Sequence, residues 1–235
     1  MTKIYVFTLL LFSLVSCNRP MTNEALITKS IEYHDPNQSW PLFKGNFKVD
    51  LAGQEVALVI DNAKGIFHWT ETLKSGEKLT GGYANKDTCM VKLNGKDILP
   101  EGKLDNFLLD CENIIGRTNY WIYMYGLPMK LKDEEVNFIG LPQLVTYLDE
   151  DLWMIKVNYN MAQSKEYWQF YFDPKNYSFR IARFFHPALG SDSEYIIYSE
   201  PERIKGLLIP TNHSWYMNAS KEYIGSEKLE VVSNP

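Results

Sequence analysis

Apolar residues recur at every second position in the second half of the chain. Trp153, Ile155 and Val157 follow this spacing, with Lys156 between the last two. The same spacing recurs further on at Trp168, Phe170 and Phe172. A period of two is that of a β-strand with one covered face. Further apolar runs at 177–185, 195–199 and 207–217 therefore predict a series of antiparallel strands.

Short apolar runs separated by turn residues predict a second meander in the first half. The runs are residues 43–51, 55–60, 64–73, 77–85 and 88–93. Pairs such as Ala52-Gly53 and Asn94-Gly95 lie between them, and such pairs are typical of hairpin turns.

Two segments have the period of a helix instead. Residues 23–34 follow a capping Thr22 and end at Asp35-Pro36, and residues 104–124 carry apolar side chains at offsets of three and four. The order of the elements predicts an α+β protein with one curved antiparallel sheet and two helices. No repeat or linker interrupts the stretch 23–235, which we expect to be a single domain.

The N-terminus has the pattern of an export signal. Lys3 precedes the apolar stretch 4–15, which is too short to span a bilayer as a helix. The residues that follow, Leu14-Val15-Ser16-Cys17, resemble the bacterial lipobox, in which the cysteine is acylated before cleavage. We therefore expect residues 1–16 to be a signal peptide, Cys17 to carry the lipid, and 17–22 to be a tether. The alternative is an ordinary secretory peptide in which Cys17 is incidental.

The charge of the chain argues against nucleic acid as a partner and against electrostatic binding to an anionic membrane. The chain has 24 basic and 29 acidic side chains and no basic run, so it lacks the clustered cations that bind nucleic acid. Cleavage before Cys17 leaves a net charge of −6, so membrane attachment should depend on the acyl chains. The residue after Cys17 is not Asp, which by resemblance to the enterobacterial sorting rule favours the outer membrane, facing the periplasm.

Two cysteines remain in the exported part. Cys89 and Cys111 are expected either to form a disulfide, which this compartment permits, or to stay as two buried thiols. No C-x-x-C is present, and no His lies within helical or strand reach of either cysteine, so no metal site is expected.

His34-Asp35 is the most suggestive pair for acid–base chemistry. An imidazole beside a carboxylate can serve as a base, but adjacent side chains usually point apart, and a helix end followed by an Asp-Pro turn explains both residues. No G-x-S-x-G, H-E-x-x-H or phosphate-binding glycine-rich motif occurs. The sequence therefore favours a protein that is not an enzyme and needs no cofactor.

Several short motifs resemble known envelope proteins. Phe172-Asp173-Pro174, Tyr198, Gly206 and Ile209-Pro210 resemble the superfamily of the lipoprotein carrier LolA and its receptor LolB. Residues 31–36 with Trp40, and residues 125–133, look like a family of uncharacterised lipoproteins in Bacteroidetes. The LolA/LolB resemblance implies a half-barrel whose concave face is covered by helices.

Such a half-barrel cannot fill its concave face with its own strands, which suggests a ligand cavity. The predicted lining residues are Trp153, Ile155, Trp168, Phe170 and Phe172. The expected function is non-enzymatic binding of a lipid, an acyl chain or a lipidated protein. Three alternatives stay open: these residues pack directly against the helices, the protein is a hydrolase with an unrecognised site, or it is a structural lipoprotein that binds a partner.

Overall fold

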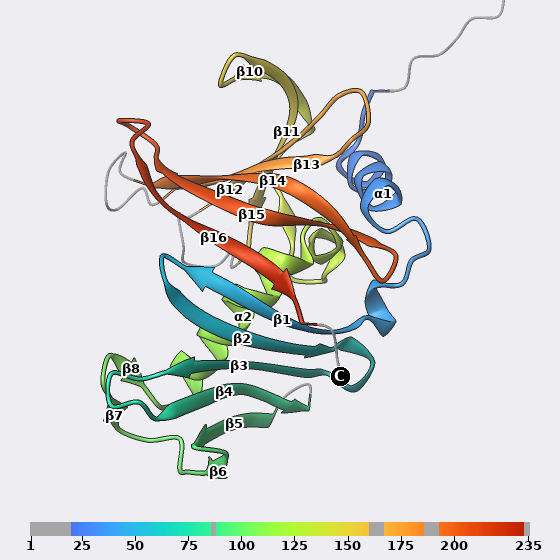
Figure 1. The fold of residues 1–235 in the computed structure, drawn as a ribbon. Coiled ribbons are helices and arrows are strands. Elements are labelled where there is room, and N and C mark those ends of the chain that lie inside the picture. The colour runs from blue at the N-terminus through green and yellow to red at the C-terminus, as the bar shows by residue number, and fades with distance from the viewer. Residues whose placement is uncertain (1–19, 86–87, 160–166, 186–192, 233–235) are drawn as a thin grey trace, which may run out of the picture.

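The computed structural model describes residues 20–85, 88–159, 167–185 and 193–232. Cys17 and the signal segment lie outside them. Among the described residues, 14 strands form one antiparallel sheet that does not close, and two helices pack on it (Figure 1). The expected α+β fold, a single curved antiparallel sheet with helices on its concave face, is confirmed.

The first half of the sheet is a meander of consecutive hairpins. Its strands are β1 (Lys44–Leu51), β2 (Gln54–Asp61), β3 (Ile66–Thr72), β4 (Lys78–Asn85), β5 (Thr88–Leu93) and β6 (Lys96–Asp97). Buried and less buried residues alternate along β1 and β3, as expected for strands with one covered face.

The second half is a longer meander. Its strands are β9 (Asn137–Phe138), β10 (Gln143–Tyr147), β11 (Glu150–Asn158), β12 (Tyr167–Phe172), β13 (Phe179–Phe185), β14 (Glu194–Ile204), β15 (Leu207–Met217) and β16 (Tyr223–Val231). β16 pairs with β1, with Leu229 opposite Val49. This pair of strands from opposite ends of the chain joins the two meanders into one sheet.

Helix α1 (Asn23–His34) has the predicted bounds. The Thr22 side chain accepts a hydrogen bond from the Ala25 amide, and Asp35 ends the helix. Its buried face is formed by Leu26, Ile27, Ser30, Ile31 and His34. This face packs against β15 and the short 3₁₀ helix η3 (Met129–Lys132).

Helix α2 (Cys111–Gly126) begins seven residues later than predicted. Leu104 and Phe107 instead lie in a separate small hairpin of β7 (Lys103–Leu104) and β8 (Phe107–Leu108). Asp105 adopts a left-handed backbone at its turn, with φ of 50°. The predicted start was wrong because a tight hairpin brings residues three or four positions apart together, as a helix does. The helix itself starts where the Asp110 side chain accepts from the Asn113 amide.

Helix α2 crosses the concave face behind strands of both meanders (Figure 1). It contacts β3, β4 and β5, and Trp121 and Ile114 on it are each 1% exposed. The main hydrophobic core lies between this face of the sheet, α1 and α2. A smaller cluster covers the convex face and consists of Leu152, Met154, Tyr171, Ile181 and Tyr195.

Candidate functional site

An aromatic cavity of about 970 Å³ lies on the concave side, between α2 and the ends of several strands. Six aromatic side chains line it: Phe67, Tyr83, Tyr120, Tyr123, Tyr159 and Trp168. Ile122, Met124 and Val136 add aliphatic surface. Its volume is within the range of small-molecule pockets, and its lining combines these aromatic and aliphatic side chains with charged and amide ones.

Helix α2 positions much of the lining. Asn119, Tyr120, Ile122 and Tyr123 lie on successive turns of the helix and reach the cavity, while Trp121 points into the core. The Tyr123 ring packs edge-on against Tyr159 with centroids 5.1 Å apart. A wide apolar surface on one helix therefore serves both the core and the cavity.

The rim of the cavity is charged. Residues 132–135, from the end of η3 onwards, are exposed, and Lys130 pairs with Asp133. The cavity is amphipathic, because charged side chains lie at its mouth and aromatic rings lie inside. An apolar ligand segment can enter the aromatic part while a polar group stays at the rim.

Of the five residues predicted to line a cavity, the structure places one at the cavity and four away from it. Trp168 lies at the cavity, whereas Ile155, Phe170 and Phe172 are each 0% exposed in the main core. Trp153 is partly buried against the same core and does not line the cavity. All five therefore pack in or against the core, and of the five only Trp168 also lines the cavity. Packing against the core corresponds to the alternative that the alternating pattern left open. The helices cover most of this sheet face and leave the Trp168 end accessible.

A buried polar cluster adjoins the cavity through Tyr120. The Tyr120 hydroxyl donates a hydrogen bond to Glu227, whose second carboxylate oxygen is 3.5 Å from Nδ1 of His213. His213 is 0% exposed, and Tyr125 stacks on it with ring centroids 4.7 Å apart. Burial, followed by the charge of Glu227, raises the pKa of Tyr120 and of Tyr125 well above that of an ordinary tyrosine. Both phenols are therefore neutral, and the Tyr120 hydroxyl donates to Glu227.

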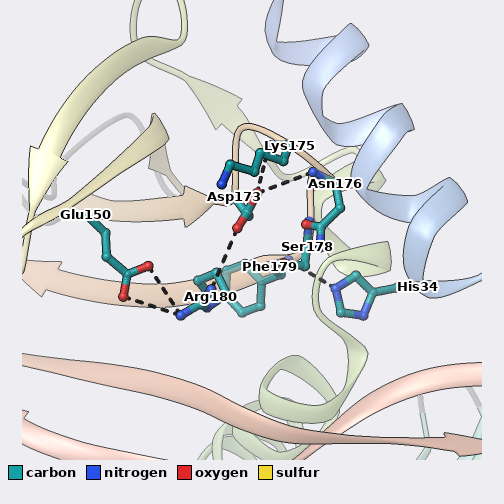
Figure 2. A network of polar contacts seen from close by, with 8 residues as sticks. All are labelled: His34, Glu150, Asp173, Lys175, Asn176, Ser178, Phe179 and Arg180. Atoms are coloured by element: carbon teal, nitrogen blue, oxygen red, sulfur yellow. Dashed lines mark hydrogen bonds and ion pairs between the residues drawn. The ribbon is translucent and has the colours of Figure 1, made fainter.

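His34 and Asp35 make separate structural contacts instead of forming a dyad. Nε2 of His34 accepts a hydrogen bond from the Phe179 amide at 3.0 Å (Figure 2), and Nδ1 lies 2.7 Å from the Leu208 carbonyl oxygen. Asp35 accepts from the backbone amides of Ser39 and Trp40. The pair is thus explained by the helix end.

The turn before Phe179 is also held by polar contacts. Asp173 accepts hydrogen bonds from the amides of Lys175 and Asn176, and Arg180 lies between Asp173 and Glu150 (Figure 2). These contacts hold the β12–β13 turn and connect it to Glu150 on β11, while the hydrogen bond between Phe179 and His34 connects it to α1.

Cys89 and Cys111 form a disulfide in the structure, with Cα atoms 5.8 Å apart. The bond connects β5 to the first residue of α2. Within the described ranges, no three His, Cys, Asp or Glu side chains are grouped so that they could hold a metal ion. None of the helices in the described part of the chain has the length and apolarity needed to cross a membrane.

Most of the cavity residues were not predicted from the sequence. Phe67 and Tyr83 lie on the first meander, Tyr120 and Tyr123 on α2, and Tyr159 follows β11. The one available signal was the aromatic density of residues 120–125, which is compatible with a buried helix as well as with a cavity wall.

The fold is similar to three solved structures. A LolA superfamily protein from Nitrosomonas europaea has a TM-score of 0.48 and 11% identity, with 92% of this chain and 96% of that chain covered. A DUF1329 family protein from Desulfovibrio piger has a TM-score of 0.42 and 9% identity, with 89% and 92% covered. An outer membrane lipoprotein-sorting protein domain from Vibrio parahaemolyticus has a TM-score of 0.39 and 8% identity, with 89% and 88% covered.

No curated protein matches the chain. The model of DUF6503, described as a family of unknown function, matches residues 2–231, and the chain therefore belongs to this family.

Proposed function

We propose that this protein is a cell-envelope lipoprotein that binds an apolar or amphiphilic ligand, such as a lipid or an acyl chain, without catalysing a reaction. The aromatic cavity of about 970 Å³ beside α2 is the observation that carries this proposal. Each methylene group that moves from water into such a cavity contributes about 0.8 kcal/mol. A ligand with several methylene groups can therefore be held by burial alone.

The arrangement of polar groups supports an amphiphilic ligand. Charged side chains are confined to the rim, at residues 130–135, while Phe67, Tyr123 and Trp168 supply apolar surface inside. A polar head group at the rim stays hydrated, so that its desolvation does not oppose binding. A lipidated protein could present the same acyl chain, with its polypeptide outside the cavity.

The proposed location follows from the N-terminal pattern. Residues 1–16 would direct export, Cys17 would be acylated, and residues 17–22 would connect the anchor to the domain 23–235. We place the mature protein at the outer membrane, facing the periplasm, because Asp does not follow Cys17.

The proposal is tested with a fluorescent fatty-acid probe and two matched tryptophan variants. Trp168→Ala removes an aromatic side chain from the cavity and should weaken probe binding by about tenfold, as expected for the loss of about 1.5 kcal/mol of apolar burial. Trp153→Ala removes the same side chain from a place outside the cavity and should leave the affinity unchanged. Urea denaturation of both variants checks that each remains folded.

Two outcomes would contradict the proposal. If the probe does not bind saturably, or if unlabelled lipid does not displace it, the cavity is not a lipid site and a structural role in binding a protein partner is favoured. Conversion of the bound ligand into a cleaved product would show that the protein is a hydrolase.

A further inference from the structure

Three large apolar side chains lie exposed between the end of β9 and the start of β10. Ile139 is 44% exposed, Leu141 is 61% exposed and Leu144 is 55% exposed. We call these three residues the 139–144 surface. Scattered exposed apolar residues are normal, but three within six positions form a patch of the kind that contacts a membrane or a partner.

The segment that carries this surface has no charge. Residues 136–148 contain no Asp, Glu, Lys or Arg, while the mature chain has a net charge of −6. Anionic lipid head groups repel acidic side chains, and the neighbouring acidic clusters at residues 133–135 and 149–151 flank this segment without lying within it.

The 139–144 surface is held in place by backbone contacts. The Ile139 amide donates a hydrogen bond to the Lys156 carbonyl at 2.9 Å, and Gln143 pairs with Met154 on β11. The exposed leucine side chains are therefore attached to a backbone that is hydrogen-bonded to β11.

The same segment is tied to the start of the chain's first helix. The Asn23 side chain donates a hydrogen bond to the Gly140 carbonyl oxygen at 2.7 Å. The start of α1 and the β10 hairpin lie at the same end of the molecule, at the top of Figure 1. Thr22 lies five positions after Cys17, and five residues of extended chain span at most about 18 Å.

From this placement we infer that the 139–144 surface rests on the membrane that holds the Cys17 acyl chains. The inference depends on the proposed lipidation of Cys17. A bilayer is the occupant that fits, because the tether keeps one within reach of Asn23 and because the patch is apolar and uncharged. Contact at both Cys17 and Leu141 would fix the orientation of the domain on the membrane, with β6 at the far end (Figure 1).

The test uses the full-length lipidated protein in vesicles of phosphatidylethanolamine and phosphatidylglycerol. Cys17 is expected to be acylated and Cys89 is bonded to Cys111, so Leu141→Cys introduces a single reactive thiol for an environment-sensitive dye. Leu99→Cys is the matched control, because Leu99 is 71% exposed and follows β6 at the opposite end of the sheet. Lipids with a quencher on the acyl chain should quench the dye at position 141 severalfold more than the dye at position 99.

Equal quenching at the two positions would overturn the inference while leaving the lipid anchor intact. A dye at position 141 that is equally shielded with and without vesicles would also overturn it, and would point to contact with a second copy of the chain. The mass of the mature N-terminus is measured on the same sample. An unmodified Cys17 would contradict the proposed anchor, and with it this inference, independently of any quenching.

Discussion

His34 is a neutral imidazole that joins three segments of the chain. Its Nε2 accepts from the Phe179 amide, so the ring proton is on Nδ1 and is donated to the Leu208 carbonyl oxygen. Burial lowers the pKa of His34, and the hydrogen bond to Leu208 opposes this effect only in part. The end of α1 is thereby connected to β13 and β15.

This arrangement predicts a dependence of stability on pH. The pKa of His34 is lower in the folded protein than the ordinary value of 6.5, so the unfolded chain binds more protons between the two values. The stability due to neutral His34 is complete above about pH 6.5 and is lost as the pH falls towards the folded-state pKa. His34→Gln should reduce the difference in the free energy of unfolding between about pH 7.5 and about pH 5.5, as measured by urea titration. His68, whose pKa is also lowered by burial, should retain its own contribution.

The contacts of His34 have a separate effect on stability. His34→Leu leaves the Phe179 amide and the Leu208 carbonyl without this partner and should lower the free energy of unfolding by about 1–3 kcal/mol for each group. His34→Gln can still donate and accept, and should lose less. Equal stability of the Leu variant and the wild type would show that these hydrogen bonds are not needed.

Gly81 is a second residue whose role is set by a single contact. A Cβ atom at this position would lie 2.4 Å from Cζ2 of Trp69, which is 0% exposed and donates a hydrogen bond to Thr118 on α2. Gly81→Ala should therefore displace the indole and destabilise the protein by about 1–3 kcal/mol. Gly116→Ala is the control, since nothing lies within 4 Å of its Cβ in α2, and it should stabilise by about 0.5–1 kcal/mol. Thermal melts of both variants decide the sign of each change.

At the scale of elements, the disulfide holds α2 on the first meander. Cys89 and Cys111 are separated by 22 residues, and closing such a loop restricts the unfolded chain. The double variant Cys89→Ser, Cys111→Ser should lose about 3 kcal/mol of stability in the chain-entropy description. The Asp110 cap of α2 is retained in this variant, so the helix should still form. Urea titrations in the presence and absence of a reductant provide the measurement, and a reductant should have no effect on the variant.

At the scale of the whole molecule, the pairing of β1 with β16 makes the two meanders one body. The described part of the chain begins at residue 20, just before α1 and near the 139–144 surface, so an anchor at Cys17 would act on one end of this body.

The anchor itself is tested by Cys17→Ser. This variant should remain uncleaved or appear in the soluble fraction, because each buried acyl methylene group contributes about 0.8 kcal/mol to membrane attachment. Mass spectrometry of the wild-type N-terminus should show an acylated cysteine as the first residue. Membrane-bound wild-type protein with an unmodified Cys17 would contradict the prediction.

The sequence alone determined the elements whose signals are local. Thr22 and Asp35-Pro36 set the bounds of α1, because capping and helix-breaking depend on residues within a few positions. The alternation of Trp168, Phe170 and Phe172 likewise predicted strand β12 and its apolar face. Strand β16 was not predicted, since its apolar residues are few and Lys228 and Glu230 interrupt them.

Only the tertiary structure decided which of these apolar residues reach the cavity. Trp168 and Phe170 share a strand face, yet Trp168 lines the cavity and Phe170 is 0% exposed. The difference depends on where α2 crosses the sheet, and this is set by contacts with β3, β4 and β5, far from β12 in the sequence. A periodic pattern fixes the face of a strand to which a side chain belongs, but the packing of distant elements over that face fixes whether the side chain is covered.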